Sequence, residues 1–105
     1  MGDRLKNRVA IVTGAGSVGP GWGNGKATAV LFAREGAKVF ASDINLAAVE
    51  ETKSIIDREK GVCSAMKVDV THAEEVKAMV DQCLKTYRRI DILHNNVGIV
   101  TVGGP

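Results

Sequence analysis

The sequence predicts an α/β fold in which helices cover both faces of a doubly wound parallel sheet. Short apolar runs alternate with segments of helical pattern in the order β-α-β-α-β-α-β. Helical connections of roughly 10 to 15 residues imply parallel strands that are joined by right-handed crossovers. The apolar runs are almost continuous, as is typical of strands that are covered on both faces. The expected strand order is 3-2-1-4.

The first three elements lie between residues 9 and 42. "VAIVT", Val9–Thr13, is rich in β-branched residues and ends at a glycine, which predicts a strand. Ala27–Arg34 has a helical composition, and Gly36 stands where a helix C-cap glycine is common. "KVFAS", Lys38–Ser42, predicts the second strand.

Three more elements follow along the chain. Apolar residues at nearly helical spacing predict a helix over Leu46–Lys60, with Asn45 as its N-cap. Ser64–Val70 is expected to form the third strand. Thr71 and Glu74 spell the capping box T-x-x-E, which predicts that the third helix begins there.

The third helix is expected to pack through one apolar stripe, and a fourth strand follows it. "IDILHN", Ile90–Asn95, predicts that strand. The stripe of the helix consists of Val76, Val80, Cys83, Leu84 and Tyr87.

Composition argues against several classes of function. The 105 residues carry a net charge of +2 and only 4% are aromatic, which argues against a nucleic-acid-binding surface. No apolar run approaches the roughly 20 residues of a transmembrane helix, and the N-terminus lacks a signal-peptide pattern, so we expect no membrane contact and a cytoplasmic location. Cys63 and Cys83 lack metal-ligand spacing and are expected to be reduced thiols.

The stretch "TGAGSVGPGWGNGK", residues 13–26, carries the strongest functional signal. Gly14, Gly16 and Gly19 spell G-x-G-x-x-G. A helix that began at Gly19 would contain three more glycines, at a cost of about 1 kcal/mol each. A Walker A loop is also excluded, because Pro20 and Ala27 stand where that loop needs Gly and Ser or Thr.

The remaining interpretation is a turn at Gly14, then a loop, then a helix that begins near Gly25 or Lys26. Gly23, Asn24 and Gly25 would then lie at the helix N-terminus, where outward-facing N–H groups and the helix dipole attract phosphate. A pyrophosphate can approach this main chain closely because no Cβ atom intervenes. The alternative is a flexible glycine-rich surface loop.

The stretch "VTGAGS…GNGKATAVLFAREGAKV" resembles the start of a short-chain dehydrogenase/reductase, whose pattern on a Rossmann-type sheet is T-G-x-x-x-G-x-G. Asp43 after the second strand, "VDV" around Asp69 and "NNVG" at residues 95–98 follow in the expected order. The family usually has N-N-A-G at the last of these.

The spacing of the glycines departs from the family pattern. Eight residues separate Gly14 from Gly23, which is more than the family places there, and Val18–Trp22 is therefore interpreted as an insertion. The resemblance leaves open which residues lie against the phosphates, the candidates being Gly16, Ser17, Gly19 and Gly23.

Asp43 bears on the identity of the cofactor. A carboxylate at the end of the second strand accepts hydrogen bonds from the hydroxyls of the adenosine ribose and repels a 2′-phosphate. No Arg or Lys follows it, since the next residues are Ile44, which we include in the candidate cofactor site, and Asn45. We therefore expect NAD rather than NADP. A solvated loop carboxylate or a helix cap is the alternative role.

The resemblance implies further cofactor contacts. Asp69 would accept a hydrogen bond from the adenine amino group, and the Val70 main chain would contact the ring; a structural role before the third helix is the alternative for Asp69. Asn95 lies at the switch point between the first and fourth strands, where it would hold the crevice open. Val97 and Gly98 follow it, and Gly98 would let the nicotinamide ribose approach.

The two histidines have no partners at the spacing of a catalytic triad or a metal site. We therefore expect neither His72 nor His94 to be catalytic, and no metal site.

By resemblance, the complete protein is an oxidoreductase that transfers hydride between a nicotinamide cofactor and an alcohol or ketone. The family's Ser and Tyr-x-x-x-Lys lie beyond the N-N-A-G segment, and Tyr87 is not followed by a Lys at that spacing, so we expect no catalytic residue in this chain and no activity from it alone. The alternatives are a non-catalytic dinucleotide-binding sensor of the same fold and a structural α/β module. The family also implies a homo-oligomer.

The sequence closes on "GIVTVGGP". The fourth strand would present an apolar edge that no later element covers, and such edges favour aggregation. We therefore expect residues 1–105 to be the N-terminal part of a single NAD(P)-binding Rossmann domain, with the catalytic part absent.

Overall fold

The computed structural model describes residues 3–17 and 24–95, and four described strands form one parallel sheet. The strands are β1 (Val9–Thr13), β2 (Lys38–Asp43), β3 (Val62–Lys67) and β4 (Ile92–Asn95). Their order is β3-β2-β1-β4, so the predicted order is confirmed. In the central register, Ile11 pairs with Phe40 on one side and with Leu93 on the other.

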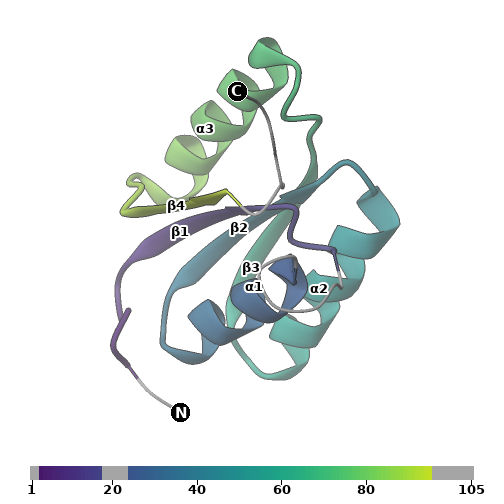
Figure 1. Cartoon of the computed structure of the whole chain (residues 1–105). Coiled ribbons are helices and arrows are strands. Elements are labelled where there is room, and N and C mark those ends of the chain that lie inside the picture. The colour runs from purple at the N-terminus through teal and green to yellow at the C-terminus, as the bar shows by residue number, and fades with distance from the viewer. Residues whose placement is uncertain (1–2, 18–23, 96–105) are drawn as a thin grey trace, which may run out of the picture.

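Helices pack on both faces of this sheet. The described helices are α1 (Gly25–Arg34), α2 (Leu46–Arg58) and α3 (Ala73–Tyr87). Figure 1 shows α1 and α2 on one face and α3 on the other. Because all the strands are parallel, their carboxyl ends meet at one edge of the sheet, which we call the carboxyl edge.

The core consists of two apolar layers, one on each face of the sheet. Side chains of β1 alternate between them: Ala10 and Val12 join the layer under α1 and α2, while Val9 and Ile11 join the layer under α3. β1 is therefore buried along its whole length. This double burial explains why its sequence is continuously apolar rather than alternating.

Asparagine side chains begin the first two helices. Asn24 Oδ1 accepts the Ala27 N–H at 2.9 Å, and Asn45 Oδ1 accepts the Ala48 N–H at 3.1 Å. Each bond satisfies one N–H group that the first helical turn leaves without a partner. The start of α1 at Gly25 and the Asn45 cap of α2 are therefore confirmed.

The prediction for the third strand was wrong at both ends. The strand spans Val62–Lys67 rather than Ser64–Val70. Its last ladder partner is Asp43, where β2 itself ends, so the chain beyond Lys67 has no neighbouring strand to pair with. The Val68 N–H donates instead to the Asp43 carbonyl, and the chain then turns toward α3.

The predicted capping box was also wrong. The N-cap of α3 is His72, whose side chain makes no capping bond. The Thr71 hydroxyl points back to Asp69, with 2.6 Å between Thr71 Oγ1 and Asp69 Oδ1. Thr71 is thus engaged by the preceding turn and is unavailable to the helix, a competition that short polar side chains often create.

The start of the fourth strand and the apolar stripe of the third helix also differ from the prediction. β4 begins at Ile92 rather than Ile90, and just ahead of it the Asp91 carboxylate accepts hydrogen bonds from the Val9 N–H and from Arg89. The inner stripe of α3 contains buried Met79 and Cys83, whereas Leu84 is 42% exposed.

Within the residues that the structure describes, no helix has the length and apolarity needed to cross a bilayer. The same residues contain no group of three or more His, Cys, Asp or Glu side chains that could hold a metal ion.

Candidate functional site

The turn after β1 is built into the carboxyl edge of the sheet. Gly14 has a φ of +63°, which glycine adopts without a Cβ penalty. The next residue, Ala15, is completely buried. Its N–H donates to the Ser42 carbonyl at 2.8 Å, and its carbonyl accepts the Thr52 hydroxyl at 2.9 Å. The turn is therefore fixed between the end of β2 and α2.

Asp43 contacts this turn directly. The Gly16 N–H donates to Asp43 Oδ2 at 2.9 Å, and the Asn45 N–H donates to Asp43 Oδ1 at 2.9 Å. Two main-chain donors therefore hold the two carboxylate oxygens in one orientation. Each oxygen has lone-pair capacity for another hydrogen bond. Beside it, Ile44 is 61% exposed and forms an apolar surface.

Gly16 is a glycine because α2 lies against it. A Cβ atom at this position would lie 2.6 Å from Ala48 Cβ and 2.9 Å from the Val49 nitrogen. Among the glycines that the sequence left open as phosphate contacts, this one has a structural reason within the protein.

Ser17 joins the turn to α1. Its hydroxyl donates to the Gly14 carbonyl at 2.8 Å and accepts the Gly25 N–H at 3.2 Å. Its carbonyl accepts the Lys26 N–H at 3.1 Å. The Lys26 ammonium extends to Glu51 of α2, with 2.7 Å between the two charged atoms. The start of α1 is thereby fastened to the turn and to α2.

One of these bonds occupies a donor that we expected to face a ligand, the Gly25 N–H. The N–H groups of Gly25, Lys26 and Ala27 all have acceptors within the chain. At Gly25 the structure therefore differs from the predicted outward-facing arrangement. The dipole of α1 still places positive potential at this end of the helix. Gly23 and the predicted insertion Val18–Trp22 lie outside the described residues, whereas residues 14–17 of the turn are described.

Asp69 is held at the start of α3. Its Oδ1 accepts both the N–H and the hydroxyl of Thr71, at 2.9 and 2.6 Å. These bonds lower the pKa of Asp69, because they favour the charged carboxylate. The contacts described for Asp69 therefore belong to the turn before α3, and the neighbouring Val70 is half-buried.

His72 lies between two carboxylates in the same turn. Its Nδ1 is 3.0 Å from Glu75 Oε2, and its Nε2 is 3.8 Å from Asp69 Oδ2. The bond to Glu75, followed by the charge of Asp69, raises the pKa of His72. Glu75 Oε1 also accepts the Asp69 N–H at 2.9 Å. His72 thus has a structural partner set that its position in the sequence did not indicate.

The end of β4 is tied to the end of β1. The Thr13 hydroxyl donates to Asn95 Oδ1 at 2.8 Å, across a pair of residues that are also partners in the sheet. The ring of His94, on the other face, meets the ring of Phe32 edge-on, with centroids 5.8 Å apart. Asn96, Val97 and Gly98 lie outside the described residues.

The carboxyl edge thus gathers the turn at residues 14–17, Asp43 with Ile44, and Asn95. Gly16 and Asp43 are in direct contact, and Asn95 joins through Thr13. Sequence reasoning missed Thr52, the side chain that connects α2 to the turn. The available signal was a polar residue in the apolar stripe of α2, between Val49 and Ile56.

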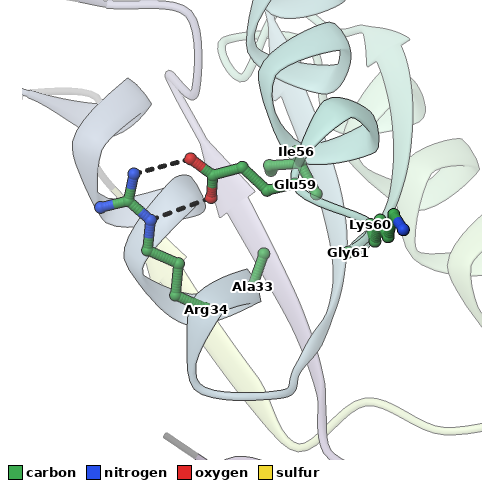
Figure 2. A pocket seen from close by; sticks show the side chains of 6 residues that line it. All are labelled: Ala33, Arg34, Ile56, Glu59, Lys60 and Gly61. Carbon is green, nitrogen blue, oxygen red and sulfur yellow. Dashed lines mark hydrogen bonds and ion pairs between the residues drawn. The ribbon is translucent and has the colours of Figure 1, made fainter. Parts of the chain in front are cut away.

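A cavity of about 200 Å³ lies at the opposite edge of the sheet, where α1 and α2 end. Figure 2 shows Arg34 and Glu59 side by side at this cavity, joined by two parallel hydrogen bonds of 2.9 and 2.7 Å. The two charged groups satisfy each other. Because its lining residues lie at the opposite edge of the sheet, the cavity does not coincide with the polar groups of the carboxyl edge.

Comparison with known proteins places the chain in a family. A family model described as short chain dehydrogenase matches residues 8–105. The chain belongs to this family. Cyclohexanol dehydrogenase of an Acinetobacter species (strain SE19) is 37% identical over 100 residues, which are 95% of this chain and 38% of that enzyme.

Solved structures of the family superpose on the fold. A putative short-chain dehydrogenase/reductase from Burkholderia xenovorans matches with a TM-score of 0.84 and 46% identity, over 98% of this chain and 41% of that one. A 7α-hydroxysteroid dehydrogenase solved in complex with NADH and 7-oxo glycochenodeoxycholic acid matches with a TM-score of 0.78 and 37% identity, over 86% of this chain and 33% of that one. The chain thus spans well under half the length of these relatives.

Proposed function

We propose that the chain binds NAD at the carboxyl edge and is the cofactor-binding part of an oxidoreductase that acts on an alcohol or ketone. The orientation of Asp43 is the observation that carries this proposal. Two N–H groups, of Gly16 and Asn45, hold the carboxylate at the end of β2, and its remaining lone pairs suit the two hydroxyls of a ribose.

Different residues of the carboxyl edge are assigned to different parts of the dinucleotide. Asp43 binds the adenosine ribose, with exposed Ile44, Asp69 and Val70 on the adenine side. The turn and the start of α1, with the helix dipole, would hold the diphosphate, and Asn95, Val97 and Gly98 would hold the nicotinamide side. The residues that would line the diphosphate are Gly14, Ser17, Gly23, Asn24 and Gly25. Gly25 would contribute the close approach of a main chain without a Cβ atom, because its N–H is bonded to Ser17.

The preference for NAD over NADP follows from charge. A 2′-phosphate would meet the Asp43 carboxylate, and the residues that follow it, Ile44 and Asn45, carry no positive charge to compensate. The nicotinamide ring supplies or accepts the hydride when the cofactor is bound. The residues of this chain bind and orient the cofactor, in keeping with the family's dehydrogenases.

Fluorescence titration of the complete polypeptide with NADH tests the proposal. We expect Asp43→Asn to weaken NADH binding roughly tenfold or more, since a hydrogen bond to a charged group is worth about 1.5 to 3 kcal/mol. The matched control is Asp81→Asn, which removes an exposed carboxylate of α3 that pairs with Lys77. Folded wild-type protein that does not bind NADH, or that prefers NADPH, contradicts the proposal.

The cytoplasmic location and the homo-oligomeric state of the complete protein are part of the same proposal. Family membership supports them. Sedimentation of the purified polypeptide would show a monomer if the assembly is wrong.

A further inference from the structure

Thr52 is a buried polar residue in the apolar face of α2. Its side chain is completely buried, between Val49 and Ile56 on the same helix face. The hydroxyl lies 2.9 Å from the Ala15 carbonyl and 3.3 Å from the Ala48 carbonyl of its own helix. A threonine hydroxyl has a single hydrogen, and the shorter distance assigns it to Ala15. The helix thus donates a hydrogen bond to the turn after β1.

The acceptor of this bond and the donor to Asp43 belong to one peptide group. The Ala15 carbonyl and the Gly16 N–H belong to the same peptide bond. The partial double-bond character of its C–N bond keeps the atoms of this group in a plane. Thr52 binds the carbonyl end of this plane, and Asp43 Oδ2 accepts from its N–H end at 2.9 Å. Fixing one end fixes the direction of the other.

The surroundings leave this peptide plane little freedom. The Ala15 N–H, in the preceding peptide, is bonded to the Ser42 carbonyl at 2.8 Å. On the other side, the backbone of α2 at Ala48 and Val49 lies so close that Gly16 has no room for a Cβ atom. Between these two constraints, the Thr52 hydroxyl bonds the carbonyl end of the plane.

We propose that Thr52 is a positioning residue for ribose recognition, which aligns the Asp43 carboxylate through the Ala15–Gly16 peptide. This inference rests on the proposed function, in which Asp43 binds the adenosine ribose. The Asn45 N–H holds the other carboxylate oxygen, so loss of Thr52 releases one of the two anchors and leaves the second.

The experiment is an NADH titration of the complete polypeptide with two substitutions at this position. Thr52→Val keeps the shape of the side chain but removes the hydrogen-bond donor. We expect the Kd for NADH to rise roughly three- to tenfold, which corresponds to the net free energy of one hydrogen bond. Thr52→Ser keeps the hydroxyl and should restore a Kd within about twofold of wild type. Thr86→Val, at an exposed threonine of α3, is the control and should bind as wild type does.

A double-mutant cycle with Asp43→Asn distinguishes alignment from a general structural role. If Thr52 acts through Asp43, Thr52→Val adds no further weakening in the Asp43→Asn background, because contacts that act in series are not additive. If Thr52→Val unfolds the protein, Thr52→Ala replaces it in the same double-mutant cycle. The smaller side chain leaves space for a water molecule at the Ala15 carbonyl.

The outcomes separate the two proposals. Wild-type binding of NADH together with equal Kd values for Thr52→Val and Thr52→Ser overturns the positioning role. Full additivity with Asp43→Asn also overturns it. Absence of NADH binding by the folded wild type instead overturns the proposed function on which it rests.

Discussion

At the scale of single residues, Gly16 is a position that cannot carry a side chain. A Cβ atom there would lie 2.6 Å from Ala48 Cβ and 2.8 Å from the Ala48 carbonyl carbon. Because the main chain of a helix cannot yield as a flexible side chain can, we expect Gly16→Ala to lower the free energy of unfolding by about 1 to 3 kcal/mol. Urea denaturation followed by circular dichroism measures this change.

A second substitution identifies which contact matters. Ala48→Gly in the Gly16→Ala background removes the nearest atom but leaves the main chain of α2 in place. We expect the double variant to stay less stable than Ala48→Gly alone. Equal stability of these two proteins would show that the helix backbone does not restrict position 16.

Residue types at the site were partly predictable. Asp43 followed from its place after a strand, because the position of a ribose-binding carboxylate is set by the order of elements. Its partners Gly16 and Asn45 did not follow, since the direction of a main-chain N–H depends on dihedral angles that a sequence pattern does not contain. Thr52 escaped notice because its partner, Ala15, is 37 residues away.

At the scale of elements, Asp91 joins the start of β1 to the chain that leads into β4. Its carboxylate accepts the Val9 N–H at 2.8 Å and two bonds from Arg89, and Arg8 is 3.5 Å away. The Arg89 bonds, followed by the Val9 bond, lower the pKa of Asp91 from 3.8 to about 2.

This shift makes the stability of the sheet depend on pH in a defined direction. The folded state favours the ionised carboxylate, so its contribution is complete above the ordinary pKa and is lost as the pH falls from about 4 to about 2. We expect Asp91→Asn to lower stability at neutral pH and to flatten the loss in this acid range. Urea midpoints measured between pH 2 and 7 give both quantities.

Asp81→Asn is the control for this experiment. Asp81 pairs with Lys77 on the exposed surface of α3, where an ion pair contributes little. It should leave the acid dependence unchanged. An Asp91→Asn protein with the full wild-type acid dependence would show that this carboxylate does not anchor β4.

The errors in predicting elements have a common physical origin. The third strand ends early because its neighbour β2 ends at Asp43, and a strand without a partner cannot continue its ladder. The third helix begins later than the capping box indicated because Asp69 takes the Thr71 hydroxyl. In both places a tertiary or competing polar contact overrode a local pattern, whereas the Asn45 cap, which meets no such competitor, was predicted correctly.

At the scale of the whole molecule, each of the two apolar layers contains one cysteine. Cys63 of β3 is buried in the layer under α1 and α2, and Cys83 of α3 is buried in the layer under α3. Burial raises the pKa of Cys63 to about 12 and that of Cys83 to about 11. We expect both thiols to react with DTNB at pH 8 roughly a hundredfold or more slowly than in urea, because reaction requires the thiolate and access.

Single-thiol variants separate the layers. In the Cys63→Ser variant only Cys83 can react, so its labelling rate measures access to the layer under α3. In the Cys83→Ser variant the labelling rate of Cys63 measures access to the layer under α1 and α2. Labelling of either thiol at the rate seen in urea would show that its layer is open under native conditions, contrary to the packing described.

The arrangement of the chain as a whole was the most predictable feature. Alternating strands and helices, with the right-handed crossover rule, leave few possible sheet orders, and β3-β2-β1-β4 is the one observed. The family model supports the same reading. The sequence pattern did not show that intrachain bonds occupy the N–H groups at the start of α1, because these bonds depend on the path of the Ser17 turn.

Amide chemical shifts recorded by NMR during a titration with NAD⁺ most directly test where the dinucleotide binds. The amides of Gly14, Gly16 and Asn45 lie at the carboxyl edge, whereas those of Lys60 and Gly61 lie at the cavity on the opposite edge (Figure 2). We predict that the first three signals move with saturable dependence on NAD⁺ and that the last two stay in place. Movement of the Lys60 and Gly61 signals, with those of Gly14, Gly16 and Asn45 unchanged, would contradict binding at the carboxyl edge.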